Sequence, residues 1–218
     1  MKDLDKTSLL KKFQQIRKYS EKLCESLEVE DYVIQAIPEV SPPKWHLAHT
    51  TWFFESFILR QYLPDYQEFD ANFSYLFNSY YQQVGEMHAR PLRGQLSRPT
   101  VKEVYAYRAY VNENIGNLLE LLNESNLNAV LELVEIGLHH EQQHQELLVM
   151  DVKYNFWVNP IRPAYLAAES DLADMLKMKF DLPNLGIDWL GNQGGMAKIG
   201  VPSTDFAYDN ESPRHTGF

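Results

Sequence analysis

A long helical pattern over residues 127–156 constrains the fold of this chain more than any other stretch, because its apolar residues recur at helical spacing. The run His140-Glu141-Gln142-Gln143-His144 lies inside it and places two imidazoles four residues apart. Residues four apart lie on the same side of a helix, so one helix can offer two nitrogens to a single metal ion. The pair shares its stripe with apolar residues, which predicts that it points toward the interior.

Three further segments have the amphipathic spacing of helices. The first covers roughly residues 4–27, and the second covers residues 41–62, where Ser41 can act as the cap and two prolines stand in the first turn. The third covers residues 100–122 and opens with the spacing of a capping box. Residues 123–126 are expected to form a non-helical break between the third helix and the long helix.

Four long helices and no convincing strand before residue 160 predict a mainly α fold, specifically a four-helix bundle over residues 1–160. Residues 64–99 form a long connection that reads as irregular. A connection of this length is usually functional or wraps around a site.

The character of the chain changes after this helical part. Residues 161–188 read as a linker with a short helix at 170–179, and glycines then cluster in residues 189–218. Short alternating segments at 197–199 and 205–208 predict the start of a β-rich, loop-rich unit. About thirty residues cannot bury a core of their own. We therefore expect an incomplete second domain, in a fragment or a naturally short relative of a longer protein.

Composition excludes several classes of function. The net charge of −10 argues against a nucleic-acid surface and an anionic membrane surface, which require clustered Lys and Arg. No apolar run approaches the roughly 20 residues of a membrane span, and the first residues lack a secretory pattern. The one cysteine, Cys24, permits no internal disulfide and is expected to be buried. These features predict a cytoplasmic protein.

A third histidine in the second helix completes a candidate metal site. His49 shares a helical stripe with Trp45 and Trp52, so it is also expected to point inward. Three neutral imidazoles from His49, His140 and His144 can take neighbouring positions around one ion and leave others open for water or substrate, as in catalytic sites. This geometry is related to the non-haem iron facial site, with histidine in place of its carboxylate.

Other interpretations of these histidines stay open. An inward-facing histidine is commonly a hydrogen-bonded core residue. The spacing of His140, Glu141 and His144 also satisfies the zincin pattern, with Glu141 as general base. The downstream continuation of that pattern is missing, and Glu141 could instead pair with a neighbouring helix. We expect His46 to support a ligand or to pack. Expected surface or loop histidines are His88, His139 and His215.

Several long motifs resemble those of a known family. Residues 41–55 (SPPKWHLAHTTWFFE) and 140–148 (HEQQHQELL) resemble the paired signatures of the ergothioneine-biosynthesis sulfoxide synthases (EgtB type), as do residues 93–100. These enzymes join an N-terminal DinB-like bundle to a C-terminal domain of the formylglycine-generating-enzyme/sulfatase-modifying type. Residues 194–215 resemble the opening of that second domain, so the resemblance covers essentially the whole chain in family order.

The resemblance implies a reaction and its cofactor. It implies an Fe(II)- and O₂-dependent enzyme that joins the thiol of cysteine or γ-glutamylcysteine to the imidazole of hercynine and oxidises the sulfur to a sulfoxide. The three iron ligands of the family correspond to His49, His140 and His144. Nickel, zinc or copper are possible substitutes in a purified sample.

The resemblance also implies substrate contacts. Gln143 would border hercynine, and Arg90 and Arg93 would hold the carboxylates of the thiol substrate, which the planar fork of arginine suits. Alternatively, both arginines anchor the long loop through salt bridges. The catalytic tyrosine of the family belongs to the C-terminal domain. We therefore expect this chain alone to bind metal without completing the coupling.

Two other functions remain open at this point. A DinB-like bundle can be a divalent-metal-dependent thiol transferase that needs no O₂. It can also be a non-catalytic module that binds metal. The histidylcysteine sulfoxide synthases of the ovothiol pathway are a close alternative within the iron class. The sequence of residues 45–53 favours the ergothioneine family over them.

Overall fold

The computed structural model describes residues 6–79, 85–167, 189–191, 193–202 and 206–218. The described residues divide into a helical unit, within residues 6–167, and a small unit, within residues 189–218. The helical unit contains α1 (Lys6–Lys22), η1 (Val29–Val33), α2 (Pro43–Phe54), η2 (Glu55–Leu59), α3 (Arg60–Tyr62), α4 (Phe73–Phe77), η3 (Arg90–Gln95), α5 (Val101–Leu121) and α6 (Glu124–Val158). The small unit contains β1 (Ala197–Ile199), η4 (Asp209–Glu211) and β2 (His215–Gly217).

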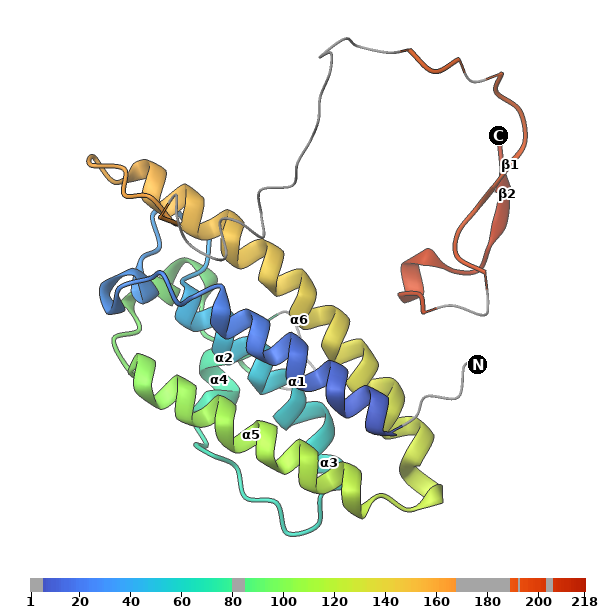
Figure 1. The fold of residues 1–218 in the computed structure, drawn as a ribbon, viewed down its shortest axis with the longest axis horizontal. Helices are drawn as coiled ribbons and strands as arrows, with labels where there is room; N and C mark the ends of the chain where they lie inside the picture. The colour runs from blue at the N-terminus through green and yellow to red at the C-terminus, as the bar shows by residue number, and fades with distance from the viewer. Residues whose placement is uncertain (1–5, 80–84, 168–188, 192, 203–205) are drawn as a thin grey trace. The chain divides into compact units, whose positions relative to one another are not determined.

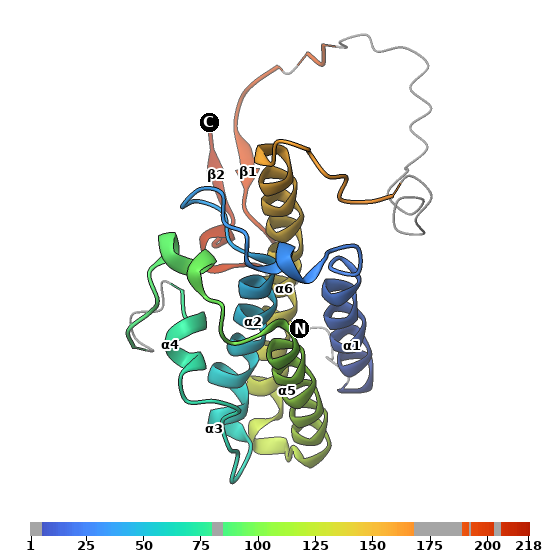
Figure 2. The same cartoon turned by 90° about the vertical axis from the view of Figure 1, so that its left-hand side faces the viewer.

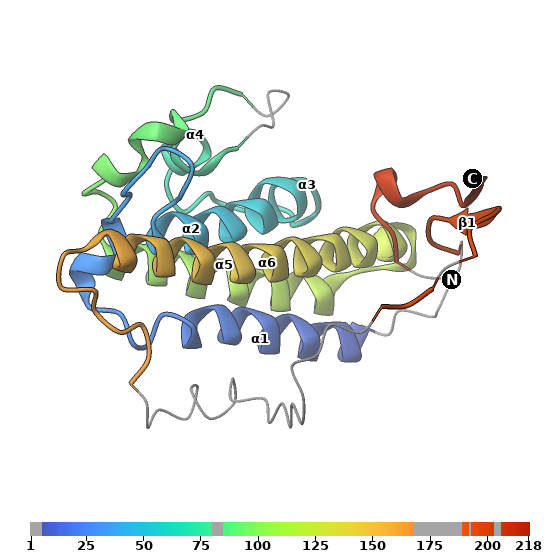
Figure 3. The ribbon, with the colours of Figure 1, turned by 90° about the horizontal axis from the view of Figure 1, so that it is seen from above.

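The four long helices of the helical unit lie alongside one another (Figures 1 and 2). Both α5 and α6 contact α1 and α2, and α4 lies against α2 (Figure 3). All 12 residues of α2 are buried. Its aromatic and aliphatic residues pack in the core, and its buried polar residues have hydrogen-bond partners there, such as the Phe77 carbonyl oxygen for His49 and the Leu47 carbonyl oxygen for Thr51.

The helix predicted over residues 41–62 is confirmed, with two differences. It continues from α2 through a π-helical turn, η2, into α3. Pro42 is its N-cap, so the prediction that Ser41 caps this helix is wrong. Ser41 is committed elsewhere: its backbone N–H donates to Asp151 Oδ2 at 2.8 Å, and its hydroxyl accepts from Arg93 at 2.9 Å.

The ends of the other helices follow from their caps. The capping box of α5 is confirmed, because Thr100 Oγ1 accepts from the Glu103 N–H at 3.2 Å and the Glu103 carboxylate accepts from the Thr100 N–H at 2.7 Å. The break expected at residues 123–126 is too long, because the Asn123 side chain accepts from the Ser125 N–H and α6 begins at Glu124.

The first helix is shorter than predicted, since α1 ends at Lys22 and residues 23–26 form turns. Cys24 is buried as expected. The connection over residues 64–99 is not wholly irregular, because it contains α4 and η3.

The small unit contains one antiparallel strand pair, in which Lys198 faces Thr216. The segment at 197–199 is a strand as predicted. Residues 206–208 are not, and the start of that predicted segment, like the helix predicted at 170–179, lies outside the described residues. His215 is exposed in β2. Among the described residues, none of the helices combines the length and apolar character needed to cross a membrane.

Candidate metal centre

Three histidines from two helices meet at one point of the helical unit. His49 comes from α2, and His140 and His144 come from consecutive turns of α6. One ring nitrogen of each lies within 4.8 Å of the others. The ring centroids are 4.6–5.0 Å apart. This group could hold a metal ion, as the helical spacing of the pair and the inward stripe of His49 predict.

Gly137 allows the two helices to come this close. A Cβ atom on Gly137 would lie 2.6 Å from Cε1 of Phe54 and 2.9 Å from Cε1 of Phe53. Both rings belong to α2, and Phe54 is fully buried, so a larger residue would require the helices to move apart. The space beside Gly137 is therefore occupied by the aromatic rings of the facing helix.

All three imidazoles are neutral at pH 7. Burial lowers the pKa of His140 to about 4. Burial, together with the charge of a neighbouring histidine, holds the pKa of His49 and of His144 well below the usual value. A neutral imidazole has one nitrogen with a free lone pair, which is the form that binds metal ions.

The orientation of His49 is fixed on three sides. Its Nδ1 lies 2.6 Å from the backbone oxygen of Phe77. A carbonyl can only accept, so Nδ1 carries the proton and Nε2 carries the lone pair. The rings of Trp45 and Trp52 stack on His49, with centroids at 4.5 and 5.5 Å. His49 is therefore held with Nε2 as its only available ligand atom.

His46 connects His144 to a carboxylate. The Nδ1 atoms of His46 and His144 are 2.9 Å apart, and Nε2 of His46 lies 3.0 Å from Asp151 Oδ2. His46 and Asp151 are both buried. The expectation that His46 supports a ligand therefore has a geometric basis.

A cavity of about 250 Å³ adjoins the histidines. Its wall includes Arg93, whose guanidinium stacks 3.3 Å above the Trp45 ring and donates to the hydroxyls of Ser41 at 2.9 Å and Ser79 at 3.2 Å. Arg90 is exposed at the same wall and donates to the backbone oxygen of Glu39. The loop over residues 64–99 thus supplies part of this wall, and the cavity places a buried positive charge near the histidines.

The structure does not bring every predicted site residue to this cavity. Gln143 is exposed on α6 and is not part of the cavity wall. Leu147, Met150 and Asp151, further along α6, do line the cavity, and sequence reasoning gave them no role in the site. The helical repeat does predict that Leu147 and Asp151 lie on the stripe of His140 and His144, and Met150 lies one turn beyond Leu147.

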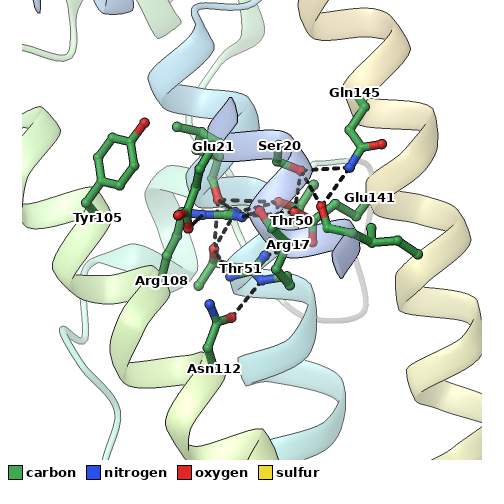
Figure 4. Close-up of polar contacts among 12 residues, drawn as sticks. Arg17, Ser20, Glu21, Thr50, Thr51, Tyr105, Arg108, Asn112, Glu141 and Gln145 are labelled. Atoms are coloured by element: carbon green, nitrogen blue, oxygen red, sulfur yellow. Dashed lines mark hydrogen bonds and ion pairs between the residues drawn. The ribbon is translucent and has the colours of Figure 1, made fainter. Parts of the chain in front are cut away.

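Glu141 occupies a separate, fully buried cluster (Figure 4). Its carboxylate forms ion pairs with Arg17 at 2.8 Å and Arg108 at 3.0 Å, and it accepts from Ser20 Oγ at 2.6 Å. Burial alone would raise the pKa of Glu141, but the two arginines outweigh it and lower the pKa to about 2.

This cluster excludes the zincin interpretation. Glu141 has no place in the cavity wall, and a carboxylate locked between two guanidinium groups is not available as a general base. The alternative, that Glu141 pairs with neighbouring helices, is confirmed.

Comparison with known proteins adds a family to this geometry. The family model of the DinB superfamily matches residues 12–148, a span that includes His49, His140 and His144. No curated protein matches the chain.

Proposed function

The chain belongs to the DinB superfamily, and from this membership we propose that His49, His140 and His144 bind one divalent metal ion at a catalytic centre. Domains of this superfamily are metal-binding. The observation that carries the proposal is the convergence of three imidazoles on the wall of a cavity. Three protein ligands leave positions on the ion open to substrate.

The bonding state of the site fits a metal ion. His140 Nδ1 is buried and has no hydrogen-bond partner among the described residues. Buried polar atoms nearly always have a partner, so an ion or a ligand in the adjoining cavity is expected to complete this ring. His49 already has its Nδ1 proton engaged by Phe77, which leaves Nε2 directed to such an ion.

We further propose that the ion is Fe(II) and that the chain is the metal-binding half of an O₂-dependent sulfoxide synthase. The substrates would be hercynine and either cysteine or γ-glutamylcysteine. The support is that the segments resembling that family, residues 41–55, 93–100 and 140–148, supply most of the cavity wall. When bound, Fe(II) would supply the redox chemistry with O₂ that C–S bond formation and sulfur oxidation require.

The protein groups at the cavity suit a substrate that carries a carboxylate. Arg93 presents a permanent positive charge, held in place by Trp45 and two serine hydroxyls. Arg90 lines the same cavity, and we propose that it would meet a second carboxylate, such as that of γ-glutamylcysteine. Both contacts are proposals, and the role of Gln143 beside hercynine stays a prediction that the cavity does not support.

The proposal extends to the organisation of the protein. We interpret residues 1–160 as a DinB-like four-helix bundle, residues 161–188 as a linker and residues 189–218 as the beginning of a formylglycine-generating-enzyme/sulfatase-modifying-type domain. The catalytic residues would lie in that domain. We propose a cytoplasmic location for the enzyme.

The test is anaerobic reconstitution of the full-length protein with Fe(II), followed by hercynine, each thiol in turn and O₂, with products identified by mass. A sulfoxide that joins the two substrates supports the proposal. Thiol transfer to an electrophile without O₂ would instead identify a thiol transferase. Metal binding with every reactant unchanged would leave a non-catalytic module and overturn the proposed reaction.

The metal site itself has a separate test. His49→Ala, His140→Ala and His144→Ala should each abolish stoichiometric metal binding in the 218-residue chain. The matched control is His139→Ala, which removes a histidine from the same helix that does not line the cavity. Full metal content in His49→Ala would overturn the assignment of ligands.

A further inference from the structure

We propose that Asp151 and His46 form a hydrogen-bonded relay that holds His144 in the tautomer that binds metal through Nε2. Both would be positioning residues, since they act through His144. This inference rests on the proposed role of His144 as a metal ligand, and it assigns a task to two residues that the proposed function leaves unused.

The relay is built from two helices. His144 and Asp151 are seven residues apart on α6, so they lie on the same side of that helix two turns apart. His46 projects from α2 between them, with Nδ1 at 2.9 Å from His144 Nδ1 and Nε2 at 3.0 Å from Asp151 Oδ2. Asp151 is anchored in turn by the backbone N–H of Ser41 at 2.8 Å.

The proton positions follow from the order of donors and acceptors. Asp151 Oδ2 accepts from Ser41, and as a carboxylate oxygen it also accepts from His46. The proton of His46 is therefore on Nε2. A neutral imidazole has only one N–H, so His46 Nδ1 must accept.

The last bond of the relay then determines the state of His144. Since His46 Nδ1 accepts, the proton between the two Nδ1 atoms belongs to His144. The lone pair of His144 is left on Nε2. The alternative tautomer would place two lone pairs against each other at 2.9 Å.

His49 reaches the same state by a different route. Its Nδ1–H donates to the Phe77 carbonyl, a neutral acceptor, whereas His144 is backed by a histidine and a carboxylate. A carboxylate behind a ligating histidine raises the basicity of that ligand. We therefore expect His144 to be the stronger electron donor of the two.

The first test measures Zn²⁺ affinity of the full chain by chelator competition. His46→Leu should weaken binding by about 10–100-fold, the usual effect of removing a group behind a metal ligand. His46→Asn should retain more affinity, because its Oδ1 can accept from His144 Nδ1–H. The Zn²⁺ affinity of Asp151→Asn should lie between those of His46→Leu and His46→Asn. His139→Leu is the matched control and should bind as the unaltered chain does.

The second test needs no variant. In the Zn²⁺-loaded chain with ¹⁵N-labelled histidine, long-range ¹H–¹⁵N spectra should show His144 protonated at Nδ1 and metal-bound at Nε2. A packing role for His46 would leave this assignment open, whereas the relay requires it. Metal bound at His144 Nδ1, or equal affinities for His46→Leu and His46→Asn, would overturn the inference.

The outcomes separate this inference from the proposed function. If the unaltered chain binds no metal, or if His49→Ala binds it fully, the metal centre itself fails. If His49→Ala loses metal while His46→Leu and Asp151→Asn bind normally, only the relay fails. Loss of binding in His46→Leu as complete as in His49→Ala, in a folded chain, would make His46 a ligand and contradict its role as a positioning residue.

Discussion

Helix α6 carries two polar clusters on neighbouring residues, and they differ in whether the protein completes them. The Glu141 cluster is closed: its carboxylate has two guanidinium partners and a hydroxyl donor, and Arg17 also bonds to Asn112 and Thr51. The histidine cluster is open. His140 Nδ1 and Asp151 Oδ1 are buried without hydrogen-bond partners among the described residues, beside a cavity.

This difference separates buried polar groups that stabilise the fold from those that are available for function. A closed cluster has its desolvation offset by its own partners, so removing one member leaves a buried charge uncompensated. An open cluster keeps bonding capacity for something that the chain does not supply. Glu141 therefore belongs to a cluster that stabilises the fold, whereas the adjacent His140 belongs to a cluster with bonding capacity left for a ligand.

Breaking the closed cluster should have the largest effect on stability. Glu141→Gln leaves Arg17 buried without its counter-charge and leaves Arg108 with Glu21 alone, and we expect the free energy of unfolding to fall by about 3–5 kcal/mol. Chemical denaturation measures this. Glu146→Gln, on the exposed side of α6, is the matched control and should change stability by less than about 0.5 kcal/mol. Equal effects of the two variants would contradict the comparison.

Acid should remove the same stabilisation without a mutation. The pKa of Glu141 falls from 4.5 when unfolded to about 2 when folded, so its contribution is present above pH 4.5 and is lost as the pH falls toward 2. That shift corresponds to about 3 kcal/mol. The difference in unfolding free energy between the unaltered chain and Glu141→Gln should therefore shrink over this range. A difference that stays constant would show that the carboxylate is not held ionised.

The open cluster should respond to metal instead. At a free metal concentration 100 times Kd, binding stabilises the native state by about 2.7 kcal/mol. Zn²⁺ should therefore raise the Tm of the unaltered chain and of Glu146→Gln. His49→Ala should show no such rise, whatever the effect of truncating this buried ring on its Tm without metal. A metal-induced rise that persists in His49→Ala would mean that the ion binds elsewhere.

The smallest effect should come from the edge of the closed cluster. Thr51 Oγ1 accepts from Arg17 at 2.8 Å and from Arg108 at 3.3 Å. The same hydroxyl donates to the Leu47 carbonyl oxygen at 2.7 Å. Thr51→Val keeps the shape of the side chain and removes all three bonds, so we expect a loss of about 1–3 kcal/mol in stability. Metal affinity should be unchanged, as measured by the same chelator competition. A change in affinity would show that the two clusters are coupled.

The sequence predicted the open cluster better than the closed one. His140 and His144 are related by the helical repeat, and His49 lies on an aromatic stripe, so local periodicity was enough to direct all three inward. Arg17 and Arg108 were not identified, because their partner Glu141 lies on a third helix, 124 and 33 residues away. Nothing in local spacing encodes such a meeting.

The same reasoning applies to the fold. The helices were predicted where apolar periodicity is strong, and their ends were less accurate where a side chain decides the boundary. Asn123 caps α6 and draws residues 124–126 into the helix. Ser41 has the right residue type for a cap, but its groups bond to Asp151 and Arg93, which are distant in sequence. Bonds to residues distant in sequence therefore override the local capping preference of Ser41 at the start of α2.

Gly137 has a consequence for how many protein ligands a bound metal ion would receive. The two histidines of α6 keep their mutual spacing whatever α2 does, because one backbone carries both. His49 arrives from the other helix, and only the absence of a methyl group at Gly137 lets the rings of Phe53 and Phe54 seat against α6. The number of protein ligands that a bound ion would have, two or three, therefore depends on Gly137, a residue with no ligand atom of its own.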